Sequence, residues 1–228
     1  MKSLLLSLAF VSCLGACSVK AQNKPFSIFG SYVLGFGNII SKAETGLTEP
    51  QSQQIEKLRS GTISQFEIGS YYKSLGLAFI YNSYDASAET NYENADVNTD
   101  ARFEDGILND DLTLQFYGGE IRYKINIFNR KMNLIYKYAL GVQKYTIEKD
   151  VQIIDNRPYT YSNKLKGSTF TSLLGAEVNY NILKSLSVGI ETSIVPSKYK
   201  KLNSEYNSYS TNESTARLNT GIKVTVTL

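Results

Sequence analysis

From residue 26 onward, hydrophobic and polar residues alternate with a period of two, which is the pattern of β-strands rather than of helices. The alternation predicts eight extended segments, each long enough for the roughly 9–11 residues that a tilted transmembrane strand needs. These segments are residues 26–40, 61–72, 75–86, 112–126, 132–147, 167–182, 186–198 and 215–228.

The connections between the segments alternate in length. The short ones are residues 73–74, 127–131 and 183–185, and the long ones are residues 41–60, 87–111, 148–166 and 199–214. Short turns at one end and long loops at the other are typical of outer-membrane barrels, and an even number of strands places both chain ends at the short-turn end. The pattern therefore predicts an all-β fold, an eight-stranded antiparallel up-and-down transmembrane β-barrel.

One face of the predicted strands is apolar, as with Leu75, Leu77 and Phe79, and carries tyrosines near the strand ends. The opposite face combines glycines with four acids and four bases, which can be buried together only if they pair. We therefore expect these charged residues to point into a narrow lumen as structural ion pairs. They are Glu67, Glu120, Arg122, Lys124, Lys137, Glu177, Glu191 and Lys223.

The opposite orientation of the strands remains an alternative. An exported barrel that is soluble or tethered by lipid would turn its apolar residues inward and bind an apolar ligand there. The glycine-rich polar face, its balanced charge and the tyrosines at the strand ends favour the arrangement with the apolar face outward.

Residues 1–21 have the pattern of a signal peptide: a positive start at Lys2, an apolar stretch over residues 4–14 and small residues before a cleavage point after Ala21. We therefore divide the chain into a signal peptide, residues 1–21, and a barrel, residues 22–228. The sequence Leu-Gly-Ala-Cys that ends at Cys17 also resembles a lipobox, so processing before a lipidated Cys17 stays open.

The last predicted strand has a polar residue, a glycine two positions later and then alternating apolar residues. With Asn219, Gly221, Val224, Val226 and Leu228, it resembles the last strand of the small eight-stranded outer-membrane barrels of the OmpA/OmpX type. Leu228 stands where phenylalanine is usual in that group. The resemblance implies an outer-membrane protein of a Gram-negative cell, inserted by the barrel-assembly machinery, with no periplasmic domain after the barrel.

Composition narrows the possible chemistry. The formal charge is +3, and loss of residues 1–21 leaves 22 basic and 21 acidic residues, which disfavours nucleic acid as a partner. The chain has no histidine, the commonest general base and metal ligand. Barrel enzymes of the outer membrane depend on histidine, so we expect a non-enzyme without cofactor or metal. An eight-stranded lumen is just wide enough for side chains, which disfavours a conducting pore despite the porin-like architecture.

The long loops are the predicted contact surfaces. The second is acidic from Asp85 to Asp111 but lacks the glycine and glutamate of a calcium-binding EF-hand loop. In the fourth, lysines from Lys198 to Lys201 are interleaved with Tyr199, Tyr206 and Tyr209. These residues are either ordinary rim residues or contacts for outer-membrane lipid and lipopolysaccharide. We expect a structural or adhesive role at the cell surface, with an extracellular ligand, if there is one, bound by the loops.

Overall fold

The computed structural model describes residues 26–41, 49–96, 103–128, 131–153, 159–204, 208–210 and 214–228. The predicted signal peptide, with Cys17 and Ala21, lies outside the described residues. The elements are β1 (Phe26–Ile39), α2 (Glu49–Leu58), β2 (Ser60–Tyr72), β3 (Leu75–Asp96), β4 (Phe103–Ile127), β5 (Met132–Ile153), β6 (Tyr159–Asn181), β7 (Leu186–Lys198), β8 (Lys201–Asn203), β9 (Ser208–Ser210) and β10 (Ser214–Thr227).

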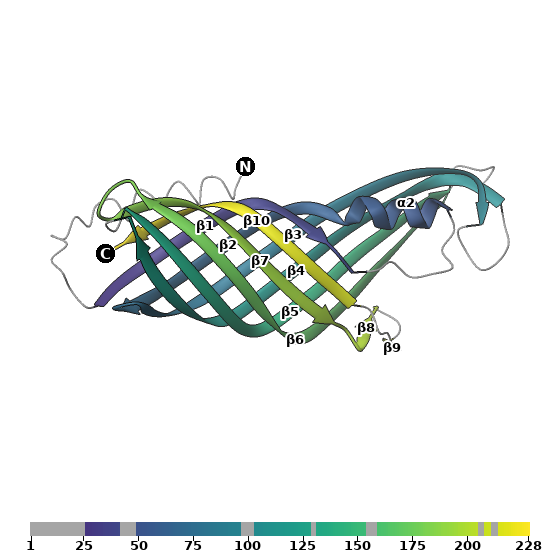
Figure 1. Cartoon of the computed structure of the whole chain (residues 1–228). Helices are drawn as coiled ribbons and strands as arrows, with labels where there is room; N and C mark the ends of the chain where they lie inside the picture. The colour runs from purple at the N-terminus through teal and green to yellow at the C-terminus, as the bar shows by residue number, and fades with distance from the viewer. Residues whose placement is uncertain are drawn as a thin grey trace.

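The eight long strands form a closed antiparallel ring, which confirms the predicted fold class (Figure 1). Each strand pairs with the next along the ring, and β10 closes the barrel by pairing with β1. Following paired residues once around the ring from Ile28 leads back to β1 at Asn38, ten residues further along. Such a stagger requires strands tilted by roughly 35–45° to the barrel axis.

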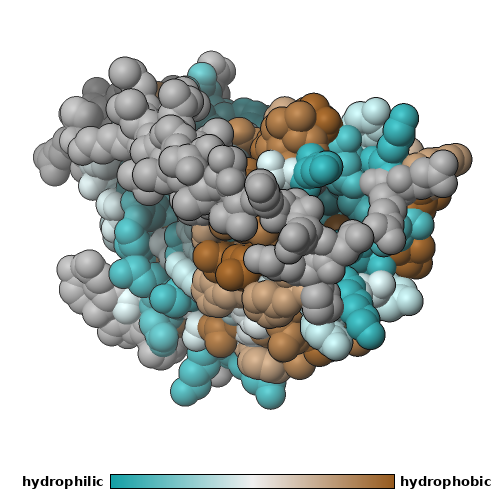
Figure 2. Space-filling view, turned by 90° about the vertical axis from the view of Figure 1, so that its left-hand side faces the viewer, coloured by the Kyte–Doolittle hydropathy of each residue, from teal (hydrophilic) through white to brown (hydrophobic). Residues whose placement is uncertain are grey.

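The outer wall of the barrel carries exposed apolar side chains, as predicted for a transmembrane barrel. Leu77 is 65% exposed, Phe170 71% and Ile222 64%, values that belong to a wall in contact with lipid rather than water. Hydrophobic residues are visible on the surface in Figure 2, which views the barrel from the end where the C-terminus lies. The alternative barrel, with these side chains lining the interior, is therefore wrong.

The barrel wall is not equally tall all round. Strands β3 to β6 have 22, 25, 22 and 23 residues, whereas β1, β2, β7 and β10 have 13 or 14. Most of the predicted loops 87–111 and 148–166 is thus paired strand, which corrects the sequence analysis. In residues 86–89, inward small residues such as Ala86 and Ala88 alternate with outward polar residues such as Glu89. This is the period of two of a strand, which is hard to recognise in a stretch so rich in acidic residues.

The interior is filled in layers, which can be followed along β5. Its inward residues run from Ile135, in an apolar cluster with Phe29 and Tyr71, through the charged Lys137 to Ala139 in a second apolar cluster. Further out, Tyr145 and Ile147 belong to the largest apolar cluster. Buried side chains therefore occupy the lumen at both ends and in the middle.

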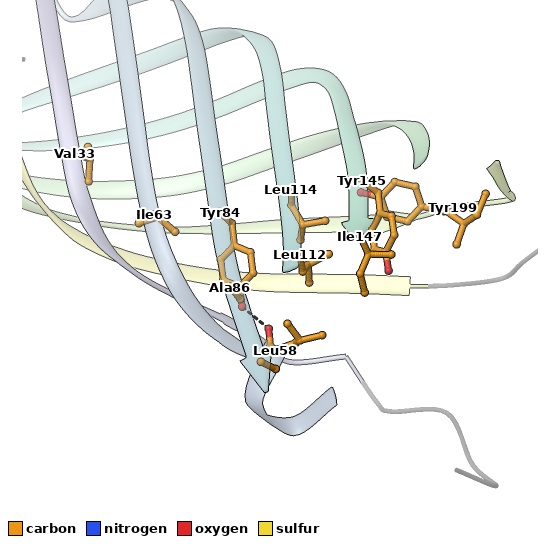
Figure 3. Close-up of a cluster of buried hydrophobic side chains, with 12 residues drawn as sticks. Val33, Leu58, Ile63, Tyr84, Ala86, Leu112, Leu114, Tyr145, Ile147 and Tyr199 are labelled. Atoms are coloured by element: carbon orange, nitrogen blue, oxygen red, sulfur yellow. Dashed lines mark hydrogen bonds between the residues drawn. The ribbon is translucent and has the colours of Figure 1, made fainter. Parts of the chain in front are cut away.

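Helix α2 packs against the taller side of the barrel. Leu58 joins the largest apolar cluster, and its carbonyl accepts a hydrogen bond of 2.7 Å from the Tyr84 hydroxyl (Figure 3). Gln54 donates to the carbonyls of Ala88 at 2.8 Å and Leu108 at 3.2 Å. The helix thus provides hydrogen-bond donors for the extended β3–β4 hairpin. No helix in the described part of the chain is long and apolar enough to cross a membrane.

Gln54→Leu should loosen α2, because the carbonyls of Ala88 and Leu108 lose their donor. Loss of buried hydrogen bonds worth about 1 kcal/mol corresponds to backbone exchange in residues 49–58 that is faster by about fivefold or more. Hydrogen exchange with mass spectrometry, on the barrel folded in detergent, measures this rate. The exposed Ser52→Ala is the control and should leave it unchanged. Equal rates in Gln54→Leu and the wild type would show that Gln54 does not fix the helix.

Candidate functional site

A cluster of charged side chains fills the lumen just above the apolar layer of Phe29, Tyr71 and Ile135. Seven of the eight predicted lumen residues meet in it, and each of their side chains is at most 3% exposed. They come from six strands, brought to one height by the register of the closed ring. The members are Glu67, Glu120, Arg122, Lys137, Glu177, Glu191 and Lys223.

Glu67 lies at the centre of this lumen cluster. Its carboxylate is 2.5 Å from the Nζ atoms of both Lys137 and Lys223, and 2.8 Å from Nη1 of Arg122. The Ser31 hydroxyl donates to it at 2.7 Å and the Gln65 amide at 2.6 Å. One carboxylate therefore contacts three cations, and its two oxygens accept five short contacts.

Lys223 holds three glutamates together. Its Nζ contacts Glu67 at 2.5 Å and Glu191 at 3.0 Å, and it also pairs with Glu177. Oxygens of these three carboxylates lie within 4.8 Å of one another, a spacing that would suit a metal ion. The ammonium group of Lys223 occupies the position that such an ion would take, so the protein supplies its own cation.

Glu120 lies at the edge of the cluster. Its nearest cationic atoms are Nε of Arg122, at 3.2 Å, and Nζ of Lys137, at 4.0 Å. Neither carboxylate oxygen has a hydrogen-bond donor among the described residues. Glu120 is thus buried with weaker compensation than Glu67.

Lys124, the eighth predicted residue, does not join the cluster. Its Nζ lies 4.5 Å from the centre of the Tyr71 ring, and it makes no ion pair with a described carboxylate. The physical reason is its height: it lies one inward position beyond Arg122 toward the short turns, past the level of the glutamates. The prediction of an ion-pair role for Lys124 is corrected accordingly.

Arg217, which the sequence analysis missed, supplies the fourth buried cation. Its side chain is fully buried, and it donates to the carbonyl of Leu114 at 3.4 Å and to the side-chain oxygen of Asn82. Asn82 in turn donates to Gln65 at 3.0 Å, and Gln65 donates to Glu67 and Glu191, both at 2.6 Å. The side-chain amides of Asn82 and Gln65 therefore link Arg217 to the cluster. Each amide turns its oxygen toward the cation and its NH₂ group toward the carboxylates.

The amide residues gave a signal that the sequence analysis did not use. Gln65 has the same strand parity as Glu67, Asn179 has that of Glu177, and Arg217 has that of Lys223. Asn179 donates to Glu177 at 2.9 Å. The inward parity of these three residues, charged or not, is the signal in the sequence that places them in the lumen.

The lumen around the cluster is crowded. A Cβ atom added to Gly175 would lie 2.8 Å from Cε of Lys137 and 3.3 Å from Cβ of Ser193. Glycine at this inward position therefore leaves room for the stem of Lys137. Chemically, the arrangement is a fixed network of paired charges that fills the cross-section of the barrel.

The C-terminal residues form the strand that closes the ring. Val224 and Leu228 are exposed on the apolar wall, whereas Asn219 and Gly221 are buried and point inward. Val226, half-buried, faces the same side as Val224 and pairs with Gly30 of β1. Whether these residues act as an assembly signal stays a prediction.

No protein-family model matches the sequence, and no curated protein matches it. Among solved structures, a major outer membrane protein from Thermus thermophilus has a TM-score of 0.53 and 8% identity, covering 89% of this chain and 99% of that one. Neisserial surface protein A has a TM-score of 0.41 and 11% identity, covering 89% and 97%. The N-terminal β-barrel domain of Pseudomonas aeruginosa OprF has a TM-score of 0.37 and 10% identity, covering 91% of this chain and 100% of that one. The chain has the fold of the outer-membrane β-barrels.

Glu67→Gln should destabilise the barrel more than Glu120→Gln. Removing the central carboxylate leaves three buried cations short of a partner, a change that costs about 3–5 kcal/mol in a buried network. Glu120 has fewer close partners, so its substitution should cost less. Urea unfolding in lipid vesicles, followed by heat-dependent gel migration, gives the free energies. Glu148→Gln is the control, because Glu148 forms an exposed pair with Lys164 worth less than about 1 kcal/mol. The reverse order of Glu67 and Glu120 would contradict the geometry.

Arg217→Gln and Lys124→Gln distinguish the two candidates for the fourth cation. Without Arg217, four buried carboxylates face three cations and Asn82 loses its donor, so we expect a loss of about 2 kcal/mol or more. Without Lys124 only a contact with an aromatic ring is lost, at about 1 kcal/mol or less. The same unfolding measurement gives the free energy that each variant loses. Equal losses for the two variants would mean that Lys124 belongs to the lumen cluster after all.

Proposed function

We propose that this protein is an outer-membrane β-barrel that is closed to solutes and displays a folded β-sheet outside the membrane, in a structural or adhesive role. The observation that carries the proposal is the height of β3 to β6, which continue as paired strands well beyond the exposed apolar belt. We call this part of the four strands, together with α2, the outer platform.

The filled interior supports closure. The charged cluster occupies the lumen in the middle of the barrel, and apolar clusters lie on both sides of it. Ions would have to pass a network in which every cation already contacts a carboxylate at or below 3.0 Å or is linked to one through amides. An eight-stranded barrel has no width to spare for such a path.

The order in the outer platform supports a binding role. Pairing of β3 with β4 continues to Asp96 and Phe103, and pairing of β5 with β6 continues to Ile153 and Tyr159. Outward positions such as Glu89 and Asp111 are exposed and polar, while Leu108 and Leu112 are buried beneath them. A preordered polar surface binds a partner with less entropic cost than a flexible loop.

Export and insertion complete the proposal. Residues 1–21 would direct the chain across the inner membrane, and β10 would be read by the barrel-assembly machinery through Asn219, Gly221, Val224, Val226 and Leu228. The pairing of β10 with β1 supports this, because β10 is the strand that closes the ring. The apolar wall would then face outer-membrane lipid.

Replacing residues 88–110 by a two-residue Asn-Gly turn between Ser87 and Asp111 tests the platform, because these two residues are register partners. The shortened barrel should still shift in heat-dependent gel migration and should show no channel steps in planar bilayers, like the wild type. Cells that display it should lose adhesion to extracellular-matrix proteins down to the level of cells without the barrel.

The matched control removes residues 150–162 from the β5–β6 hairpin and joins Lys149 to its register partner Asn163 by the same turn. It shows whether adhesion belongs to one hairpin or to both. Steady channel conductance in the wild type would overturn closure. Adhesion that survives both deletions would overturn the adhesive role and leave a structural one.

A further inference from the structure

Five exposed lysines lie at the outer end of the apolar wall on the β5–β8 side of the barrel. We call them the basic rim: Lys144, Lys166, Lys198, Lys200 and Lys201. None of the five makes an ion pair with a described carboxylate. We propose that the basic rim is a binding site for the phosphate groups of a phosphorylated membrane lipid in the outer leaflet, an inference that rests on the proposed insertion and orientation.

The position of the lysines along their strands points to a lipid. On β5, Lys144 is the next outward residue after the exposed Val142, the last outward apolar residue of that strand in the belt. On β6, Lys166 lies two outward positions beyond Phe170, which is 71% exposed. On β7, Lys198 is the next outward residue after Pro196. The amines thus lie where acyl chains end and headgroups begin.

Neighbouring strands bring the lysines together. Thr146 pairs with Lys166 while Lys144 pairs with Ser168, so the two lysines are diagonal neighbours on one face of the sheet. Lys166 also pairs with Asn203 of β8, which puts Lys201 two residues from its partner. Lysines from three strands therefore share one stretch of the outer wall.

The segment that carries Lys198, Lys200 and Lys201 is held in place from inside. Tyr199 is fully buried and its ring lies 5.2 Å from that of Tyr145, and Leu202 is 6% exposed. Because its side chain is buried, Tyr199 is neither an ordinary exposed rim residue nor a contact for lipid, which corrects both expectations for this residue. Side chains on either side of Tyr199 are turned outward, so the lysines are presented by an ordered segment.

The wall on the other side of the barrel, at the same height, lacks such a group of lysines in the part that the structure describes. On β3, the outward residue beyond Tyr81 and Ser83 is Asp85, which accepts hydrogen bonds from Ser83 at 3.1 Å and Thr113 at 2.9 Å. On the side of the basic rim itself, the next outward acid of β5, Glu148, is already paired with Lys164. A cation-rich arc on one side of an otherwise neutral or acidic wall favours a specific anionic headgroup over general attraction to the membrane.

The test compares two triple variants of the full barrel folded in neutral detergent. One is Lys166→Gln, Lys198→Gln and Lys201→Gln, and the other, at the short-turn end, is Lys73→Gln, Lys131→Gln and Lys184→Gln. Native mass spectrometry measures binding of diphosphorylated lipid A and of the same lipid without phosphates. The rim variant should bind diphosphorylated lipid A about 10- to 100-fold more weakly, and the control should match the wild type.

Each result supports or overturns the site. Equal weakening in both triples would show unspecific charge attraction, and no weakening in either would show that the rim is not used; both overturn the proposal. Equal binding of the phosphate-free lipid would overturn the phosphate recognition. Inorganic phosphate that displaces lipid A at equal concentration would show an anion site rather than a lipid site.

A charge-preserving variant with Lys166→Arg, Lys198→Arg and Lys201→Arg should bind lipid A as the wild type does, because phosphate recognition needs the positive charge. Heat-dependent gel migration of every variant reports folding separately. A wild-type barrel that migrates as folded but fails to bind lipid A contradicts the rim alone, whereas loss of the heat-dependent shift in the wild type contradicts the proposed insertion.

Discussion

The burial of charge inside a narrow barrel is the constraint on which the rest of the structure depends. Four glutamates lie in the lumen at almost no exposure, and a buried carboxylate without a partner would cost several kcal/mol. Three cations contact them directly, and Arg217 is joined to them through Asn82 and Gln65. Because the charged side chains are paired inside the barrel, the outer wall can be apolar. The same paired side chains fill the lumen.

The unequal height of the wall separates two kinds of surface. The tall side, β3 to β6, continues beyond the apolar belt as an outer platform with α2 packed against it. At the outer end of the belt, the basic rim runs from the tall strands β5 and β6 to the lower β7 and β8. One barrel thus presents an ordered polar sheet away from the membrane and a row of lysines at its boundary.

Much of the fold could be predicted from the alternation of residues. The number of long strands, the short turns and the outward apolar face follow from a period of two, since a side chain two positions along a strand points the same way. The height of β3 to β6 was not predicted, because residues 87–111 read as an acidic loop. Their pairing depends on the small inward Ala86 and Ala88 packing with Leu112, which lies more than twenty residues further along the chain.

The sequence by itself determined which residues face inward and that acids and bases would meet there. Only the tertiary structure decided which of them pair. Lys124 and Arg217 have the same inward parity on their own strands, yet the stagger of the closed ring places Arg217 within a relay to the glutamates and Lys124 below them against Tyr71. Strand parity is a local property of the chain, whereas height in the lumen is set by the register of all eight strands together.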